Sequence, residues 1–190
     1  MRCLACGKLS FEIICKNCQT TLLSTSLHSR EVAKDFFVYS FYNYTDISKL
    51  LNAKYHFFGD KILQILASNS FKKFSSSFTF SNQVYAISID DVVTKDFSHS
   101  AILAQNLKSN IIKPYFNVLK AQNRVSYAGK SLEFRQKNKR DFIYSGKQYL
   151  NIILVDDIIT TGATMQEAKI ILEKNNCEVL FGLVLSDAKY

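Results

Sequence analysis

The chain has 190 residues, with 24 Lys and Arg, 16 Asp and Glu, and a formal net charge of +8. At 47% hydrophobic and 21% charged residues it can bury a packed core, which excludes wholesale disorder, and its length suits one domain with a small appendage. No run approaches the roughly 18 apolar residues of a membrane span, and residues 1–6 leave no room for a signal-peptide apolar region. We therefore expect a cytoplasmic protein with reduced thiols and no membrane insertion.

The positive charge is concentrated in one segment. Residues 108–147 contain ten basic side chains and two acidic ones, Glu133 and Asp141, so this segment carries +8 and the remaining 150 residues sum to zero. A concentrated positive field indicates a phosphate or polyanionic partner more strongly than dispersed charge does.

The N-terminus contains two C-x-x-C pairs, Cys3 with Cys6 and Cys15 with Cys18. Each pair can turn both sulfurs toward one point, so the four thiolates predict a structural zinc site with no open position for chemistry. About 25 residues cannot bury enough apolar surface to fold alone, so the metal would supply the folding energy. A redox dithiol, two disulfides or incidental cysteines are alternatives that fit the tandem spacing less well. We expect a zinc-binding module over residues 1–25 and a second domain over residues 26–190.

The rest of the chain alternates between predicted strands and helices. Aromatic and β-branched runs predict strands, spaced apolar residues predict helices, and serine-rich or basic stretches predict loops. In chain order we expect a strand or hairpin edge at 32–44, helices at 46–55 and 62–67, a loop at 75–82, a strand at 84–89, a helix at 102–107, a short strand at 111–112, a long basic loop at 120–140, a strand at 150–155, a helix at 163–174 and a strand at 179–185. This alternation predicts an α/β fold with a largely parallel sheet flanked by helices.

The clearest chemical signal is the run from Ile152 to Thr164, which reads IILVDDIITTGAT. A buried strand leads to Asp156 and Asp157, and a loop of small residues then opens a helix. In an open parallel sheet, ligands bind at this end of the strand, and the backbone amides of a helix N-terminus favour a phosphate. Two adjacent carboxylates suit ribose hydroxyls, or Mg²⁺ through its water shell. The alternative is a strand that ends in solvated acids, followed by an ordinary helix start.

This run resembles the phosphoribosyl-pyrophosphate (PRPP) loop of the type I phosphoribosyltransferases. The resemblance implies a type I phosphoribosyltransferase-like domain in which residues 26–80 partly form a cap over the site. It also implies Mg²⁺ held by Asp156 and Asp157 through PRPP or water. The PRPP-binding residues implied are Asp156, Asp157, Thr160, Thr161, Gly162, Ala163 and Thr164.

Catalysis is harder to assign. Purine-salvage members of that family usually have an aspartate at the position of Thr160, and a threonine cannot act as a general base at neutral pH. The resemblance therefore disfavours purine-base salvage, although orotate-type members with a small polar residue there fit. The sequence contains no recognisable acceptor site, so the catalytic residues stay unknown.

The order of the parts is similar to the ComF family of competence proteins, which act in natural transformation. A four-cysteine module, a central basic region and a C-terminal PRPP loop occur in that order, and the blocks Phe97–Ser100, Arg124 with Ser126, and Arg135 with Asn138 match the family in outline. The chain departs from the family where Phe97–Ser100 replaces a usual Arg-Gly-Phe-Asn block. The resemblance implies DNA uptake, PRPP binding, handling of incoming single-stranded DNA, and DNA-import helicase or channel proteins as partners.

The basic loop has two interpretations. Its side chains could contact the phosphates of single-stranded DNA while neighbouring aromatic residues stack on bases, or they could bind only pyrophosphate over the PRPP site. The residues concerned are Lys120, Arg124, Lys130, Arg135, Lys137, Lys139 and Arg140. Three functions stay open: a transformation protein that binds PRPP and DNA, a working phosphoribosyltransferase in nucleotide salvage, and a structural adaptor between the import channel and a helicase.

Overall fold

The main sheet is largely parallel, as the sequence predicts. The computed structural model describes residues 1–53, 58–89, 98–123 and 140–189. In these residues the sheet has the strand order β1-β2-β8-β7-β3-β4. The strands are β1 His28–Ala33, β2 Phe36–Asn43, β3 Val84–Ser88, β4 Ile112–Pro114, β7 Asn151–Ile159 and β8 Glu178–Asp187. Strand β1 pairs antiparallel with β2 at one edge, and the other neighbouring pairs are parallel.

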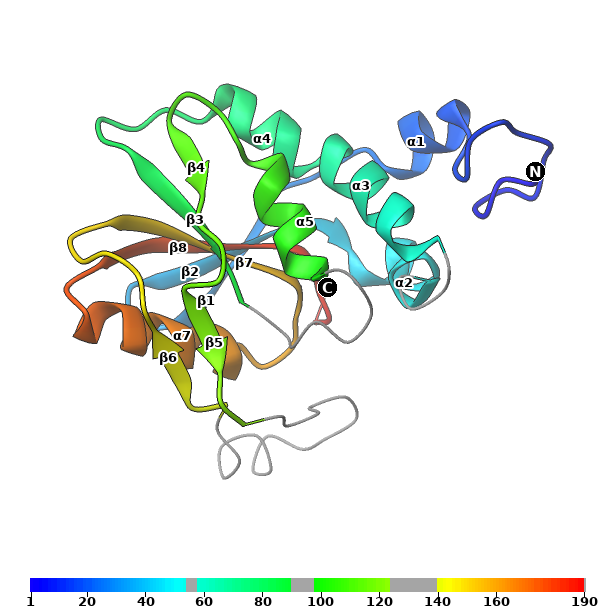
Figure 1. The fold of residues 1–190 in the computed structure, drawn as a ribbon. Helices are drawn as coiled ribbons and strands as arrows, with labels where there is room; N and C mark the ends of the chain where they lie inside the picture. The colour runs from blue at the N-terminus through cyan, green and yellow to red at the C-terminus, as the bar shows by residue number, and fades with distance from the viewer. Residues whose placement is uncertain (54–57, 90–97, 124–139, 190) are drawn as a thin grey trace.

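Helices cover both faces of the sheet (Figure 1). They are α1 Lys16–Leu22, α2 Tyr44–Ala53, α3 Gly59–Asn69, α4 Phe71–Ser77, α5 His99–Asn106 and α7 Ala163–Lys174. Helices α2 to α5 pack on one face. Helix α7 packs on the other, together with a hairpin of β5 (Leu119–Ala121) and β6 (Phe142–Tyr144). None of the helices in the described ranges combines the length and the apolar character that crossing a membrane requires.

Strand β7 lies between two cores. Ile153 and Val155 pack with α3 and α5, whereas Ile152 and Leu154 pack with α7. All four side chains are fully buried. An apolar run without alternation is typical of a central parallel strand, because helices cover both faces of the sheet and side chains on both sides of the strand are buried.

The direction of the strand order reverses between β3 and β7. The chain passes from β3 through α5 to β4 on one side, and from β7 through α7 to β8 on the other. In open α/β sheets, the carboxyl ends of the strands at such a reversal border the crevice in which ligands bind. The reversal puts this crevice at the ends of β3 and β7.

Two predicted loops differ from the structure, and one predicted strand region agrees with it. The predicted loop at 75–82 begins inside α4, because the buried Phe71 and Ser75 draw its first residues into the helical layer. The predicted strand or hairpin edge at 32–44 is a hairpin of β1 and β2, and Phe36 and Phe41 bury their rings in the two cores. The predicted basic loop begins as a strand, since Lys120 lies in β5 opposite Ile143 of β6.

Candidate functional site

Strand β7 carries two adjacent carboxylates at the crevice. Its pairing with β3 stops at Val155, whose carbonyl accepts a hydrogen bond from Ile89 N at 2.8 Å. From Asp156 onward β7 continues along β8. Asp156 and Asp157 are half-buried, and Asp157 N donates to Asp156 Oδ1 at 2.8 Å. The two predicted carboxylates therefore lie where β3 and β7 separate.

Helix α7 begins at a position that only glycine fits. Gly162 has φ 86°, in the left-handed region, and a Cβ placed on it would lie 2.9 Å from the Cβ of Val32. Both the backbone conformation and the neighbouring strand β1 therefore require a residue without a side chain. A glycine N-cap also leaves the helix without a side-chain cap.

The start of α7 can accept an anion. Helix geometry leaves the backbone amides of residues 163–165 without an intrahelical acceptor. The Ala163 amide donates to Thr161 Oγ1 at 3.4 Å, a long hydrogen bond that an anion could replace. The first turn contains no acidic residue, so nothing on it opposes the positive end of the helix dipole.

The N-terminus of α5 lies at the same edge of the sheet. Ser98 caps this helix by accepting a hydrogen bond from Ala101 N at 3.2 Å. Ser100 Oγ donates to Ile89 O at 2.8 Å, and Ile89 N is the group that bonds to Val155 of β7. Two helix N-termini, from α5 and α7 on opposite faces, thus flank the crevice, and each contributes partial positive charge.

Arg30 is a residue that sequence reasoning missed. From β1, its Nε and Nη2 donate to the two carboxylate oxygens of Asp187 at 2.5 and 3.1 Å, and Nη2 also donates to Thr160 O at 2.8 Å. Asp187, at the end of β8, is only 2% exposed. Nothing in the sequence around Arg30 indicates this role, because its partners lie 130 and 157 positions away.

The β5–β6 hairpin, which belongs to the basic segment 108–147, is hydrogen-bonded to α7 just before β6 begins. The backbone amides of Arg140 and Asp141 donate to the Glu167 carboxylate at 3.2 and 2.7 Å. Lys120 is exposed on β5. The other residues named for this segment and for the family blocks lie outside the described ranges: Phe97, Arg124, Ser126, Lys130, Arg135, Lys137, Asn138 and Lys139.

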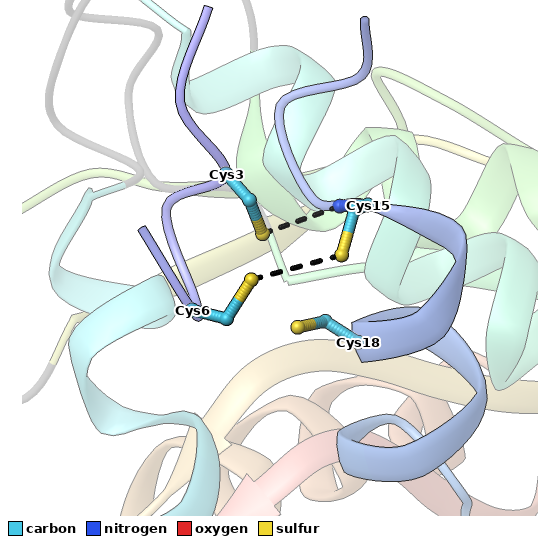
Figure 2. A group of neighbouring side chains, drawn as sticks. All are labelled: Cys3, Cys6, Cys15 and Cys18. Carbon is cyan, nitrogen blue, oxygen red and sulfur yellow. Dashed lines mark hydrogen bonds between the residues drawn. The ribbon is translucent and has the colours of Figure 1, made fainter. Parts of the chain in front are cut away.

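The four cysteine sulfurs converge on one point (Figure 2). The Sγ atoms of Cys3, Cys6, Cys15 and Cys18 all lie within 4.8 Å of one another. Cys6 Sγ and Cys15 Sγ are 3.8 Å apart. Zinc–sulfur bonds of about 2.3 Å arranged tetrahedrally put the sulfurs about 3.8 Å apart. The cluster therefore fits a metal ion such as zinc.

The sulfurs are not chemically equivalent. Burial raises the pKa of the Cys3 thiol, but backbone hydrogen bonds from Cys15, Cys6 and Ala5 outweigh burial and lower the pKa to about 6. Hydrogen bonding to Cys15, together with burial, raises the pKa of Cys18 to about 12. A bound dication removes this difference, because coordinated thiols lose their protons outright.

The cysteine module packs on the rest of the chain. Ile14 and Leu23 are buried in the same core as α2 and α3, and Asn69 of α3 donates from Nδ2 to Gln19 Oε1 of α1 at 3.4 Å. The predicted boundary near residue 25 falls in the connection between α1 and β1. Two domains on either side of it stay a prediction.

Comparison with known proteins gives a likeness to solved structures alone. No protein-family model matches the chain, and no curated protein matches it. Among solved structures, a crystal structure of adenine phosphoribosyltransferase is similar, with 12% sequence identity, a TM-score of 0.43, and coverage of 89% of both chains. A likeness at this level carries no functional conclusion.

Proposed function

We propose that the chain binds PRPP together with Mg²⁺ at the loop between β7 and α7. The observation that carries this proposal is the meeting, at the reversal of the strand order, of the Asp156–Asp157 pair with the N-terminus of α7. Carboxylates suit ribose hydroxyls and hydrated Mg²⁺, and helix amides suit a phosphate. PRPP presents ribose hydroxyls and phosphates in one molecule, and its pyrophosphate binds Mg²⁺.

Each predicted residue has a distinct task in this proposal. Asp156 and Asp157 hold the ribose hydroxyls or the water shell of Mg²⁺. The residues from Thr160 to Thr164 surround one phosphate with amides and hydroxyls, and Gly162 lets the backbone approach closely. The N-terminus of α5 supplies positive potential for a second anionic group. Mg²⁺, when bound, neutralises pyrophosphate charge.

The wider role that we propose is in natural transformation, in the cytoplasm, as in the ComF family. The basic segment then contacts incoming single-stranded DNA, and a DNA-import helicase or channel protein is the partner. Two observations support a role next to the PRPP loop. The segment carries a charge of +8, and its residues Arg140 and Asp141 are hydrogen-bonded to Glu167 of α7. Zinc in the cysteine module is structural.

A working phosphoribosyltransferase in nucleotide salvage is the second candidate. The chain has a threonine, Thr160, where purine-salvage enzymes have an aspartate, and its carbonyl is occupied by Arg30. A PRPP-binding site does not by itself establish turnover, because the acceptor site decides which reaction occurs. A structural adaptor with vestigial PRPP binding is the third.

Ligand-dependent melting tests the binding proposal. PRPP with Mg²⁺ should raise the melting temperature of the wild type but not of Asp156→Asn/Asp157→Asn, because saturation at about 100 times the dissociation constant stabilises by about 2.7 kcal/mol. Asp46→Asn/Asp60→Asn is the matched control, since it also removes two carboxylates, from the first turns of α2 and α3. Equal ligand-induced shifts in the wild type and the β7 variant would overturn the assignment.

A genetic experiment separates the wider roles. The Asp156→Asn/Asp157→Asn variant is placed in a naturally competent cell, and transformation and nucleobase uptake are scored separately. Loss of transformation alone supports the competence role. Loss of nucleobase uptake alone supports salvage.

A further inference from the structure

We propose that Arg30 is a positioning residue that fixes the orientation of the PRPP loop from strand β1. This inference rests on the proposed function, since it concerns how the same loop is held ready for its ligand. Arg30 lies outside the run of residues that the sequence assigns to PRPP, and it acts on the loop through the backbone.

Strand β1 contacts the loop before, at and after the glycine. Arg30 Nη2 donates to Thr160 O at 2.8 Å, and Val32 packs against Gly162. Gln166, in the first turn of α7, donates from its side-chain amide to Val32 O. The edge strand β1 therefore packs against the loop and the start of α7 and is hydrogen-bonded to both.

The guanidinium of Arg30 has little freedom of its own. Its Nε and Nη2 are bonded to both oxygens of the buried Asp187, and this fork geometry fixes the plane of the guanidinium. Asp187 is held in turn, because Lys189 N donates to its Oδ1 at 3.0 Å. The end of β8 is tied to β7 by Ala188 N, which donates to Ile159 O at 2.8 Å.

A fixed carbonyl at Thr160 also fixes the next amide. The carbonyl of Thr160 and the N–H of Thr161 belong to one planar peptide group and point in opposite directions. Arg30, by holding the carbonyl on the β1 side, aims the Thr161 amide away from β1. Thr161 is among the residues whose amides the sequence predicts as phosphate donors, so the direction of this amide bears on PRPP affinity.

Arg30→Lys tests this role directly. Lysine keeps the positive charge beside Asp187 but lacks the planar fork that reaches the carbonyl as well. Glu173→Gln is the matched control, because it breaks the Lys169–Glu173 ion pair on α7 without touching the loop. We measure PRPP–Mg²⁺ affinity by calorimetry, the melting temperature without ligand, and the backbone amide resonance of Thr161.

The expected result is a loss of PRPP affinity of about tenfold in Arg30→Lys, which corresponds to about 1.4 kcal/mol. The Thr161 resonance should shift in the unligated variant, which a purely structural loss elsewhere would not produce. Glu173→Gln should match the wild type in both readouts. Wild-type affinity together with an unshifted Thr161 resonance in Arg30→Lys would overturn the role of Arg30.

Two further outcomes are decisive. If Arg30→Lys fails to fold, Asp187→Asn weakens the fork that fixes the Arg30 guanidinium: weaker PRPP binding at an unchanged melting temperature supports the inference, and unchanged affinity overturns it. If the wild type itself does not bind PRPP, the proposed function fails and the positioning role fails with it. This failure differs from the failure of the positioning role alone, in which the wild type and Arg30→Lys bind PRPP equally well.

Discussion

Gly162 and Val32 pack closely against each other at the start of α7. A Cβ on Gly162 would lie 2.9 Å from the Cβ of Val32, and Gly162 adopts φ 86°. The contact joins the loop after the central strand β7 to the edge strand β1. Two separate physical requirements, close packing and a left-handed backbone, therefore act on one residue.

Gly162→Ala should destabilise the protein through both requirements. A left-handed conformation costs an ordinary residue about 1–2 kcal/mol, and the overpacking against Val32 adds about 1–3 kcal/mol. Val32→Gly in the same chain removes both Val32 atoms that the new methyl group would meet, Cβ and Cγ1, and should relieve the packing part only. The free energy of unfolding from chemical denaturation measures both.

Gly7→Ala is the control for the backbone part. Gly7 has φ 73°, and a Cβ placed on it would have no atom within 4 Å, so this variant should lose only the conformational contribution. If Gly162→Ala did not lower the free energy of unfolding in the Val32→Gly background, the backbone requirement would be refuted.

The cysteine cluster should hold one zinc ion per chain. Cys3→Ser/Cys15→Ser removes one thiolate from each C-x-x-C pair, so the bound zinc should disappear and residues 1–25 should lose their fold, because the metal supplies their folding energy. Elemental analysis and limited proteolysis measure the two effects. Cys177→Ser is the matched control, since this buried cysteine lies outside the cluster, and it should keep full zinc content. Zinc retained in the double variant would end this interpretation.

Tyr42 should make the protein less stable at high pH. Burial raises the pKa of its phenol above the usual value of 10.0, despite a hydrogen bond with Ser70 that lowers it, and the hydroxyl donates to Leu66 O at 3.2 Å. Above about pH 10 the unfolded chain releases this proton while the folded chain keeps it. Stability therefore falls as pH rises, by up to about 1.4 kcal/mol per pH unit for one group.

Tyr42→Phe should remove this part of the pH dependence. Denaturation midpoints between pH 9 and about pH 11 measure the slope, which is gentler in Tyr42→Phe than in the wild type. Tyr39→Phe leaves Tyr42 in place and serves as the control. The same slope in Tyr42→Phe and the wild type would contradict the assignment to Tyr42.

The basic segment should give DNA binding a steep dependence on salt. Each phosphate contact with single-stranded DNA contributes about 0.7 to the slope of log affinity against log salt. Changing Lys137, Lys139 and Arg140 to Ala should therefore lower the slope by about 2. Fluorescence anisotropy at several salt concentrations measures it, and Lys72→Ala/Lys73→Ala/Lys174→Ala is a control with equal charge loss elsewhere. An unaltered slope would show that the segment contacts pyrophosphate only or neither ligand.

Local patterns predicted the strand and the helix on either side of the loop well. The helix from Ala163 to Lys174 has the bounds that its apolar spacing predicts, and the strand before it contains the two carboxylates that follow the apolar run. Strand β7 extends to Ile159, further than the predicted end at 155, because β8 continues to pair with it beyond the apolar run. Pairing with a neighbour, which no local pattern records, decides where a strand ends.

The sequence by itself determined which residues could carry chemistry: four cysteines at knuckle spacing, two carboxylates after an apolar strand, and a glycine before a helix. These signals are readable because helix periodicity, strand burial and C-x-x-C turns depend on residues close together in the chain. The tertiary structure alone decided that β1 lies beneath the loop, that Arg30 bonds to Asp187 and to the carbonyl of Thr160, and that α5 and α7 begin at one crevice. The Arg30 contacts join residues more than a hundred positions apart, so only the packing of the sheet brings them together.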